Sequence, residues 1–211
     1  MIPPGRTPEA QAMSFVEVAR RVEPVAEVEC LRMNPGANCD FRIVVDDRPT
    51  MPPNAYQTLD SSGRPVLAFT AALIAIVRNG DELAFVMSHE ASHHILGHLE
   101  RMDRNASEGA AAFGRIARET AGATPDQIRE AELLGAQVGA RSYSKEFELE
   151  ADRFGTRVAA EAGFDPLHGA EFFLRLPDPG NRLMGTHPSN GERIATVQSA
   201  AAELGLGPFR R

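Results

Sequence analysis

Apolar residues recur every three or four positions along most of the chain, with polar residues between them, which is the pattern of helices packed on a common core. Three shorter apolar runs, each bounded by turn residues, predict strands. The predicted strands are 41–46, 54–58 and 65–69, and the predicted helices are 8–29, 71–78, 82–102, 108–121, 125–141, 145–162, 166–175 and 190–204. The expected fold class is therefore α+β, mostly helical with a small sheet.

Length and composition predict one globular unit. The 211 residues, 43% hydrophobic and 24% charged, suffice for one core and are few for two full domains. We predict a single domain over 1–211, with an N-terminal helix and cysteine segment at 1–40 and a core at 41–204. The net charge of −7 and the scattered acidic residues argue against nucleic acid or an anionic membrane surface as a partner. No stretch reaches the roughly eighteen apolar residues of a transmembrane helix, so none is predicted.

The predicted helix 82–102 contains an HExxH motif at His89–His93. Positions four apart lie on the same face of a helix, so His89 and His93 can each direct a ring nitrogen at one tetrahedral Zn²⁺ ion. Glu90 is then placed to take a proton from a zinc-bound water. The motif therefore predicts a zinc hydrolase with one Zn²⁺ per chain.

Two further histidines, His94 and His98, follow the motif. On a continuous helix, His98 lies about 140° round the axis from His93 and points away from the metal. His94 is also off the ligand face. We predict that both are hydrogen-bonded helix histidines, and that the third ligand comes from elsewhere in the chain.

The predicted helix 145–162 offers that ligand, because Glu148 and Asp152 are four residues apart and share a face. Glu148 would bind Zn²⁺, and Asp152 would accept a hydrogen bond from the outer nitrogen of a ligating histidine and so fix its orientation. The alternative is a solvated acidic face, which we expect for the neighbouring Glu146 and Glu150.

With these motifs the chain resembles the gluzincin metallopeptidases that include the heat-shock protease HtpX, the CAAX prenyl endopeptidases, and the Oma-type and BepA-like proteases. The resemblance rests on the lead-in at Asp81–Ala84, the pair Glu148–Asp152, and a late His187-Pro188 followed by Arg193. It implies a zincin-like metallopeptidase domain with a small sheet beside the active-site helix, and zinc endopeptidase activity. It also implies that His187 stabilises the oxyanion of the tetrahedral intermediate, and that Arg193 supports His187 or an acidic neighbour.

The same resemblance implies that the strand beginning at Asn54 and Ala55 lies beside the metal cleft, where an extended polypeptide can add as a further strand. The alternative is a plain edge hairpin closed by residues 61–63. The expected substrates are extended or misfolded polypeptides, in envelope protein quality control. A second hypothesis is a latent zinc protein that binds unfolded chains as a chaperone or adaptor.

Between the two ligand helices, residues 105–139 are rich in glycine and alanine. Small residues allow close helix packing, so an ordinary helical hairpin is one interpretation of this region. A lid over the cleft is the other, and the sequence leaves both open.

Cys30 and Cys39 are the only cysteines, and they flank a turn-rich segment at 34–38. We predict a disulfide between them in a periplasmic or otherwise exported protein, with two free thiols as the alternative. Residues 1–5 do not resemble a secretory signal, so an export signal or a lipid anchor would lie upstream of this sequence.

Overall fold

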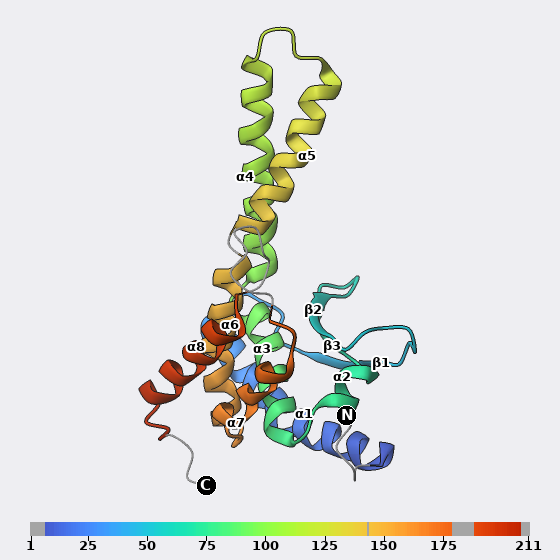
Figure 1. Cartoon of the computed structure of the whole chain (residues 1–211), viewed down its shortest axis with the longest axis vertical. Coiled ribbons are helices and arrows are strands. Elements are labelled where there is room, and N and C mark those ends of the chain that lie inside the picture. The colour runs from blue at the N-terminus through green and yellow to red at the C-terminus, as the bar shows by residue number, and fades with distance from the viewer. Residues whose placement is uncertain (1–6, 143, 179–187, 208–211) are drawn as a thin grey trace.

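A computed structural model describes residues 7–142, 144–178 and 188–207. A small sheet lies at one side of a body of helices, and one long helical hairpin extends from this body (Figure 1). The helices are α1 (Pro8–Met33), α2 (Ala71–Ile76), α3 (Gly80–Ile95), α4 (His98–Glu119), α5 (Pro125–Ser142), α6 (Ser144–Glu161), α7 (Pro166–Ala170), the 3₁₀ helix η1 (Glu171–Arg175) and α8 (Asn190–Glu203). The strands are β1 (Arg42–Asp46), β2 (Ala55–Leu59) and β3 (Pro65–Thr70). The predicted α+β, mostly helical fold class is confirmed.

The sheet has the strand order β1-β3-β2, with β1 parallel and β2 antiparallel to β3. A turn joins β2 to β3: Asp60 accepts hydrogen bonds from the backbone of Ser62 and Arg64, and Gly63 adopts φ 81°. β3 is the central strand and is largely buried. β2 therefore has an outer edge that pairs with no other strand in the described part of the chain.

Helix α3 runs through the centre of the body, and every residue from Glu82 to Ser92 is buried. It contacts α1, α6, α7 and β2. A helix that is enclosed on all sides carries apolar residues nearly all round, as α3 does before its motif. The HExxH motif thus occupies a rigid, densely packed element.

α3 ends at Ile95, earlier than predicted. Gly97 adopts a left-handed conformation with φ 65°, and α4 begins at the next residue, His98. The predicted helix 82–102 is therefore wrong at its C-terminal end, because Gly97 allows a sharp turn that residues with a Cβ rarely adopt. α4 then continues without a break through residues 103–107, where a gap between helices was expected.

α4 and α5 form the long hairpin, which extends away from the body in Figure 1. Its two helices approach closely at glycines: a Cβ at Gly135 would lie 2.2 Å from the carbonyl oxygen of Gly109. Only the base of the hairpin, at His98, Leu99 and Met102, lines the cleft described below. The structure thus corresponds to the helical-hairpin interpretation of residues 105–139. Among the described helices, none has both the length and the apolar character needed to cross a bilayer.

The N-terminal helix α1 belongs to the same core as α3. Phe15, Val18 and Val22 are buried in that core. After α1 the chain turns back, and Cys30 and Cys39 are joined by a disulfide with their Cα atoms 5.7 Å apart. The bond fixes the turn that leads from α1 into β1.

Glu29 ties α1 to α6 through an ion pair that should make stability depend on pH. Its buried carboxylate accepts hydrogen bonds from Arg32 and from Arg157 of α6. The hydrogen bond from Arg32 and the charge of Arg157 outweigh burial and hold the pKa of Glu29 below its usual 4.5. A group whose pKa falls on folding stabilises the native state above its unfolded pKa, and this contribution is lost as the pH falls through the folded pKa.

We therefore expect the difference in unfolding free energy between the wild type and Glu29→Gln, measured by urea denaturation, to be constant above about pH 5.5 and to shrink below about pH 4.5. Glu17→Gln, at an exposed position of the same helix, is the control and should show no such change. A difference for Glu29→Gln that keeps its full size at about pH 3 would contradict the role of this ion pair.

Candidate active site

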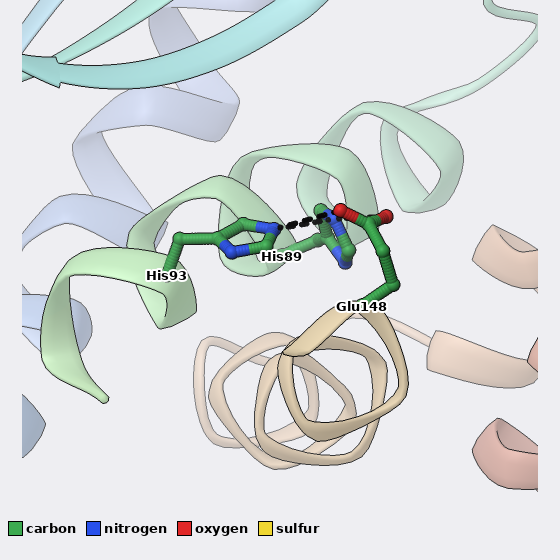
Figure 2. A group of neighbouring side chains, drawn as sticks. All are labelled: His89, His93 and Glu148. Atoms are coloured by element: carbon green, nitrogen blue, oxygen red, sulfur yellow. Dashed lines mark hydrogen bonds and ion pairs between the residues drawn. The ribbon is translucent and has the colours of Figure 1, made fainter. Parts of the chain in front are cut away.

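Three side chains from two helices converge on one point: His89 and His93 from α3 and Glu148 from α6 (Figure 2). The Nε2 atoms of the two histidines are 3.1 Å apart, and each lies 3.5 Å from an oxygen of Glu148. A tetrahedral zinc ion with bonds of about 2.0–2.1 Å requires ligand atoms about 3.3 Å apart. The donor types and their separations therefore fit one zinc ion.

The contact between α3 and α6 depends on Gly155. A Cβ at this position would lie 3.0 Å from the backbone nitrogen of His89. Because Gly155 has no side chain, α6 packs directly on the backbone of α3. Glu148 and Asp152, which lie about two turns and one turn earlier on α6, are thereby brought to the HExxH motif.

His89 is oriented by Asp152 and Arg193. Its Nδ1 lies 2.9 Å from Oδ1 of the fully buried Asp152, which leaves Nε2 facing His93 and Glu148. Arg193 of α8 donates to both oxygens of Asp152, at 2.7 and 2.6 Å. The structure thus places Asp152 and Arg193 behind His89, and their predicted role in holding a metal-binding histidine stays a prediction.

The surroundings of the two histidines differ electrostatically. Burial and the nearby Arg193 lower the pKa of His89, but hydrogen bonds to Asp152 and Glu148 outweigh them and raise it to about 10. Burial, followed by the proximity of His89, lowers the pKa of His93 to about 3. The carboxylates of Asp152 and Glu148 therefore favour positive charge at the position of His89, and burial disfavours it at His93.

Glu90 is buried beside the three donors. Burial raises its pKa to about 7, and the charge of Glu148 acts in the same direction, whereas His89 opposes it. A hydrogen bond from the backbone of Gln57 links this carboxylate to β2. A base whose pKa lies near neutral pH is well suited to accept a proton and return it.

A cleft of about 550 Å³ opens beside these residues. One wall is the start of β2, including the predicted substrate-binding residues Asn54 and Ala55. The lining as a whole is largely apolar and includes Phe172 and Phe173 of η1. Thr70 fixes the entry to β2, because its hydroxyl donates to the carbonyl of Asn54 while it also caps α2.

The predicted oxyanion residue His187 lies outside the described residues. The next residue, Pro188, lines the cleft. Arg193 also lies close to the donors, with a guanidinium nitrogen 3.6 Å from Glu148. Its guanidinium is stacked on the ring of Phe173, 3.9 Å from the ring centroid.

His98 is not among the donors that converge on the metal site, and it is a hydrogen-bonded helix histidine as predicted, but it lies closer to His93 than a continuous helix would place it. The turn at Gly97 carries His98 back, and its Nδ1 lies 2.8 Å from Nδ1 of His93. Its other nitrogen, Nε2, lies 3.0 Å from Glu150, so this glutamate, although its side chain is 44% exposed, also pairs with a buried histidine, which the expected solvated face did not include. The signal in the sequence was Gly97, a residue that commonly ends a helix, between His93 and His98.

His94, in contrast, lies off the ligand face. Its Nε2 is 2.7 Å from the backbone oxygen of Asn38, and its ring packs edge-on against Phe41. It is thus a hydrogen-bonded helix histidine, as the spacing predicts. It links the active-site helix to the turn that holds Cys39.

Two histidines of an HExxH helix, a glutamate from a second helix, and a buried acid beside them define a metallopeptidase of the gluzincin class. Residues 13–201 match the model of Peptidase family M48. The chain therefore belongs to Peptidase family M48, and the family resemblance and the class of enzyme predicted from the sequence are confirmed.

Relatives in this family carry a common name. A protein named beta-barrel assembly-enhancing protease from Escherichia coli strain K12 is 30% identical over 146 residues, covering 64% of this chain and 30% of that protein. One named putative beta-barrel assembly-enhancing protease from Vibrio cholerae serotype O1 is 33% identical over 150 residues, covering 65% of this chain and 31% of that protein. The matched region thus spans less than a third of the length of these relatives.

Proposed function

We propose that this chain is a zinc-dependent endopeptidase domain that cleaves extended or misfolded polypeptides. The observation that carries the proposal is the convergence of His89, His93 and Glu148: the two Nε2 atoms are 3.1 Å apart, and each lies 3.5 Å from one of the two oxygens of Glu148, which fits one zinc ion. Three donors favour a catalytic site over a purely structural one, because closed structural sites use four protein ligands. The buried Glu90 beside the donors also supports catalysis.

In this proposal Zn²⁺ is held by Nε2 of His89, Nε2 of His93 and the carboxylate of Glu148, and when bound it polarises the peptide carbonyl and the attacking water. Glu90 takes a proton from that water and passes it to the leaving amine. Asp152 and Arg193 keep His89 in the orientation for binding. His187 keeps its predicted role as the donor to the oxyanion.

The free edge of β2 supports an extended substrate. Asn54 and Ala55 line the cleft at the start of this edge strand, and Gln57 contacts Glu90 through its backbone. A polypeptide added to β2 would form main-chain hydrogen bonds and pass over the catalytic groups. Folded proteins rarely offer a free strand, so unfolded or misfolded chains fit this edge best.

We place the protein in the cell envelope. The relatives are named for assembly of β-barrels, and the disulfide between Cys30 and Cys39 agrees with an oxidising compartment such as the periplasm. Quality control of envelope proteins is the role that combines these features. The alternative, a zinc-containing chaperone or adaptor, uses the same cleft and edge strand without turnover.

The test uses the zinc-loaded chain with unfolded casein, and a tightly folded protein as the control substrate. We expect the zinc-loaded chain to cleave casein and to leave the folded protein intact. Cleavage of casein should be lost when a chelator removes the metal and should recover when zinc is added. Cleavage that persists without metal would contradict the zinc mechanism. Binding of casein without cleavage, at one zinc per chain, would favour the chaperone or adaptor.

A further inference from the structure

A series of polar contacts leads from the solvent to Nδ1 of His93, the ring nitrogen that faces away from the metal site. Arg101 donates to both oxygens of Glu150, at 2.5 and 3.3 Å, and Glu150 lies 3.0 Å from Nε2 of His98. Nδ1 of His98 lies 2.8 Å from Nδ1 of His93. His93 in turn directs its Nε2 at the metal site, so this series of contacts ends on a proposed ligand.

His98 lies in the middle of this series of contacts and is buried. It is only 2% exposed, and its ring stacks on that of Phe147, with the centroids 4.7 Å apart and the planes at 13°. The guanidinium of Arg101 also lies over the ring of Phe147, 4.2 Å from its centroid. The imidazole of His98 is therefore held in one plane, with its two nitrogens facing His93 and Glu150.

The hydrogen-bonding capacity of each group determines the direction of the bonds. A carboxylate only accepts, so Nε2 of His98 donates to Glu150, and Nδ1 of a neutral His98 is left as an acceptor. Nδ1 of His93 then donates to it. Nε2 of His93 keeps its lone pair, which is the form required of a metal ligand.

The same logic operates on the other ligand of α3. His89 donates through Nδ1 to Asp152, and Asp152 is held by Arg193. Each histidine ligand thus has an acceptor behind it, and an arginine supports each carboxylate. The difference is that His93 reaches its carboxylate through a second histidine.

We propose that His98 is a positioning residue for His93, with Glu150 and Arg101 as its support. The inference rests on the proposed function, since it concerns how the zinc site is held. It assigns a role to a histidine outside the HExxH motif and to a glutamate other than the ligand. A ligand oriented in this way should bind zinc more tightly, and the loss of such a partner lowers metal affinity about 10–100-fold.

The experiment measures zinc affinity by competition with a chelator in the wild type and in four variants of the full chain. His98→Phe keeps the stacking on Phe147 and removes the acceptor, whereas His98→Asn keeps an acceptor near the place of Nδ1. Glu150→Ala removes the support at a side chain that is 44% exposed. His94→Phe is the matched control, because this histidine is next to His93 and contacts Asn38 instead.

We expect His98→Phe to weaken zinc binding about 10–100-fold, His98→Asn and His94→Phe to stay within about 3-fold of the wild type, and Glu150→Ala to fall between them. Thermal melting of the zinc-free proteins checks that each variant folds. If His98→Phe does not fold, Glu150→Ala decides: weaker binding supports the proposal and wild-type binding overturns it.

Wild-type affinity in a folded His98→Phe would overturn the proposal. Equal losses in His98→Phe and His98→Asn would also overturn it, because packing and not the acceptor would then be responsible. Failure of the proposed function is distinguishable. A wild type that binds no zinc refutes both, whereas the expected affinities without cleavage of casein refute only the enzymatic activity.

Discussion

Glu90→Gln is expected to lower kcat on unfolded casein by about 10²–10⁴-fold, the usual contribution of a general acid–base group. Glutamine has nearly the same shape as glutamate but cannot accept the proton of the attacking water. Glu90 is not among the three donors that face the metal site, so the variant should still bind one zinc ion. Activity and zinc content, measured on the same samples, check this prediction.

The control for Glu90→Gln is Glu146→Gln, which makes the same chemical change at an exposed position of α6. Its activity should equal that of the wild type. If Glu90→Gln kept wild-type turnover, Glu90 would not be the base. If it lost its zinc, the loss of activity would report on the metal site and not on proton transfer.

Glu148→Ala is expected to abolish both zinc binding and cleavage. The variant removes one of the three donors and leaves only the two histidines to hold the metal. Loss of a direct ligand should reduce affinity by more than the roughly 100-fold that follows from losing an outer hydrogen-bond partner. The melting temperature gives a second measurement, since zinc that binds the native state raises it in the wild type and should not do so in the variant.

Glu146→Ala serves as the control here, because it lies two residues earlier on the same helix and is exposed. It should retain zinc, activity and the zinc-dependent rise in melting temperature. A Glu148→Ala protein with unchanged zinc content would contradict the assignment of this ligand. The neighbouring Asp152 or Glu150 would then have to be considered as the donor.

The sequence by itself determined the features that depend on local periodicity. The spacing of His89 and His93 places both on one helical face, and the spacing of Glu148 and Asp152 does the same on a second helix. Hydrophobic patterns located nearly all the helices and strands, because a segment that buries one face carries apolar residues at the spacing of its own secondary structure. The mostly helical class and the family therefore follow from the chain without its structure.

Contacts between distant or redirected segments were decided only by the tertiary structure. The left-handed backbone at Gly97 ends α3 and redirects the chain, so the helical spacing between His93 and His98 no longer applies. His98 therefore contacts His93 and Glu150. The packing of α6 on α3 at Gly155 sets the separation of Glu148 from the two histidines. Such features depend on backbone turns and on close approach between segments, and periodicity carries no information about either.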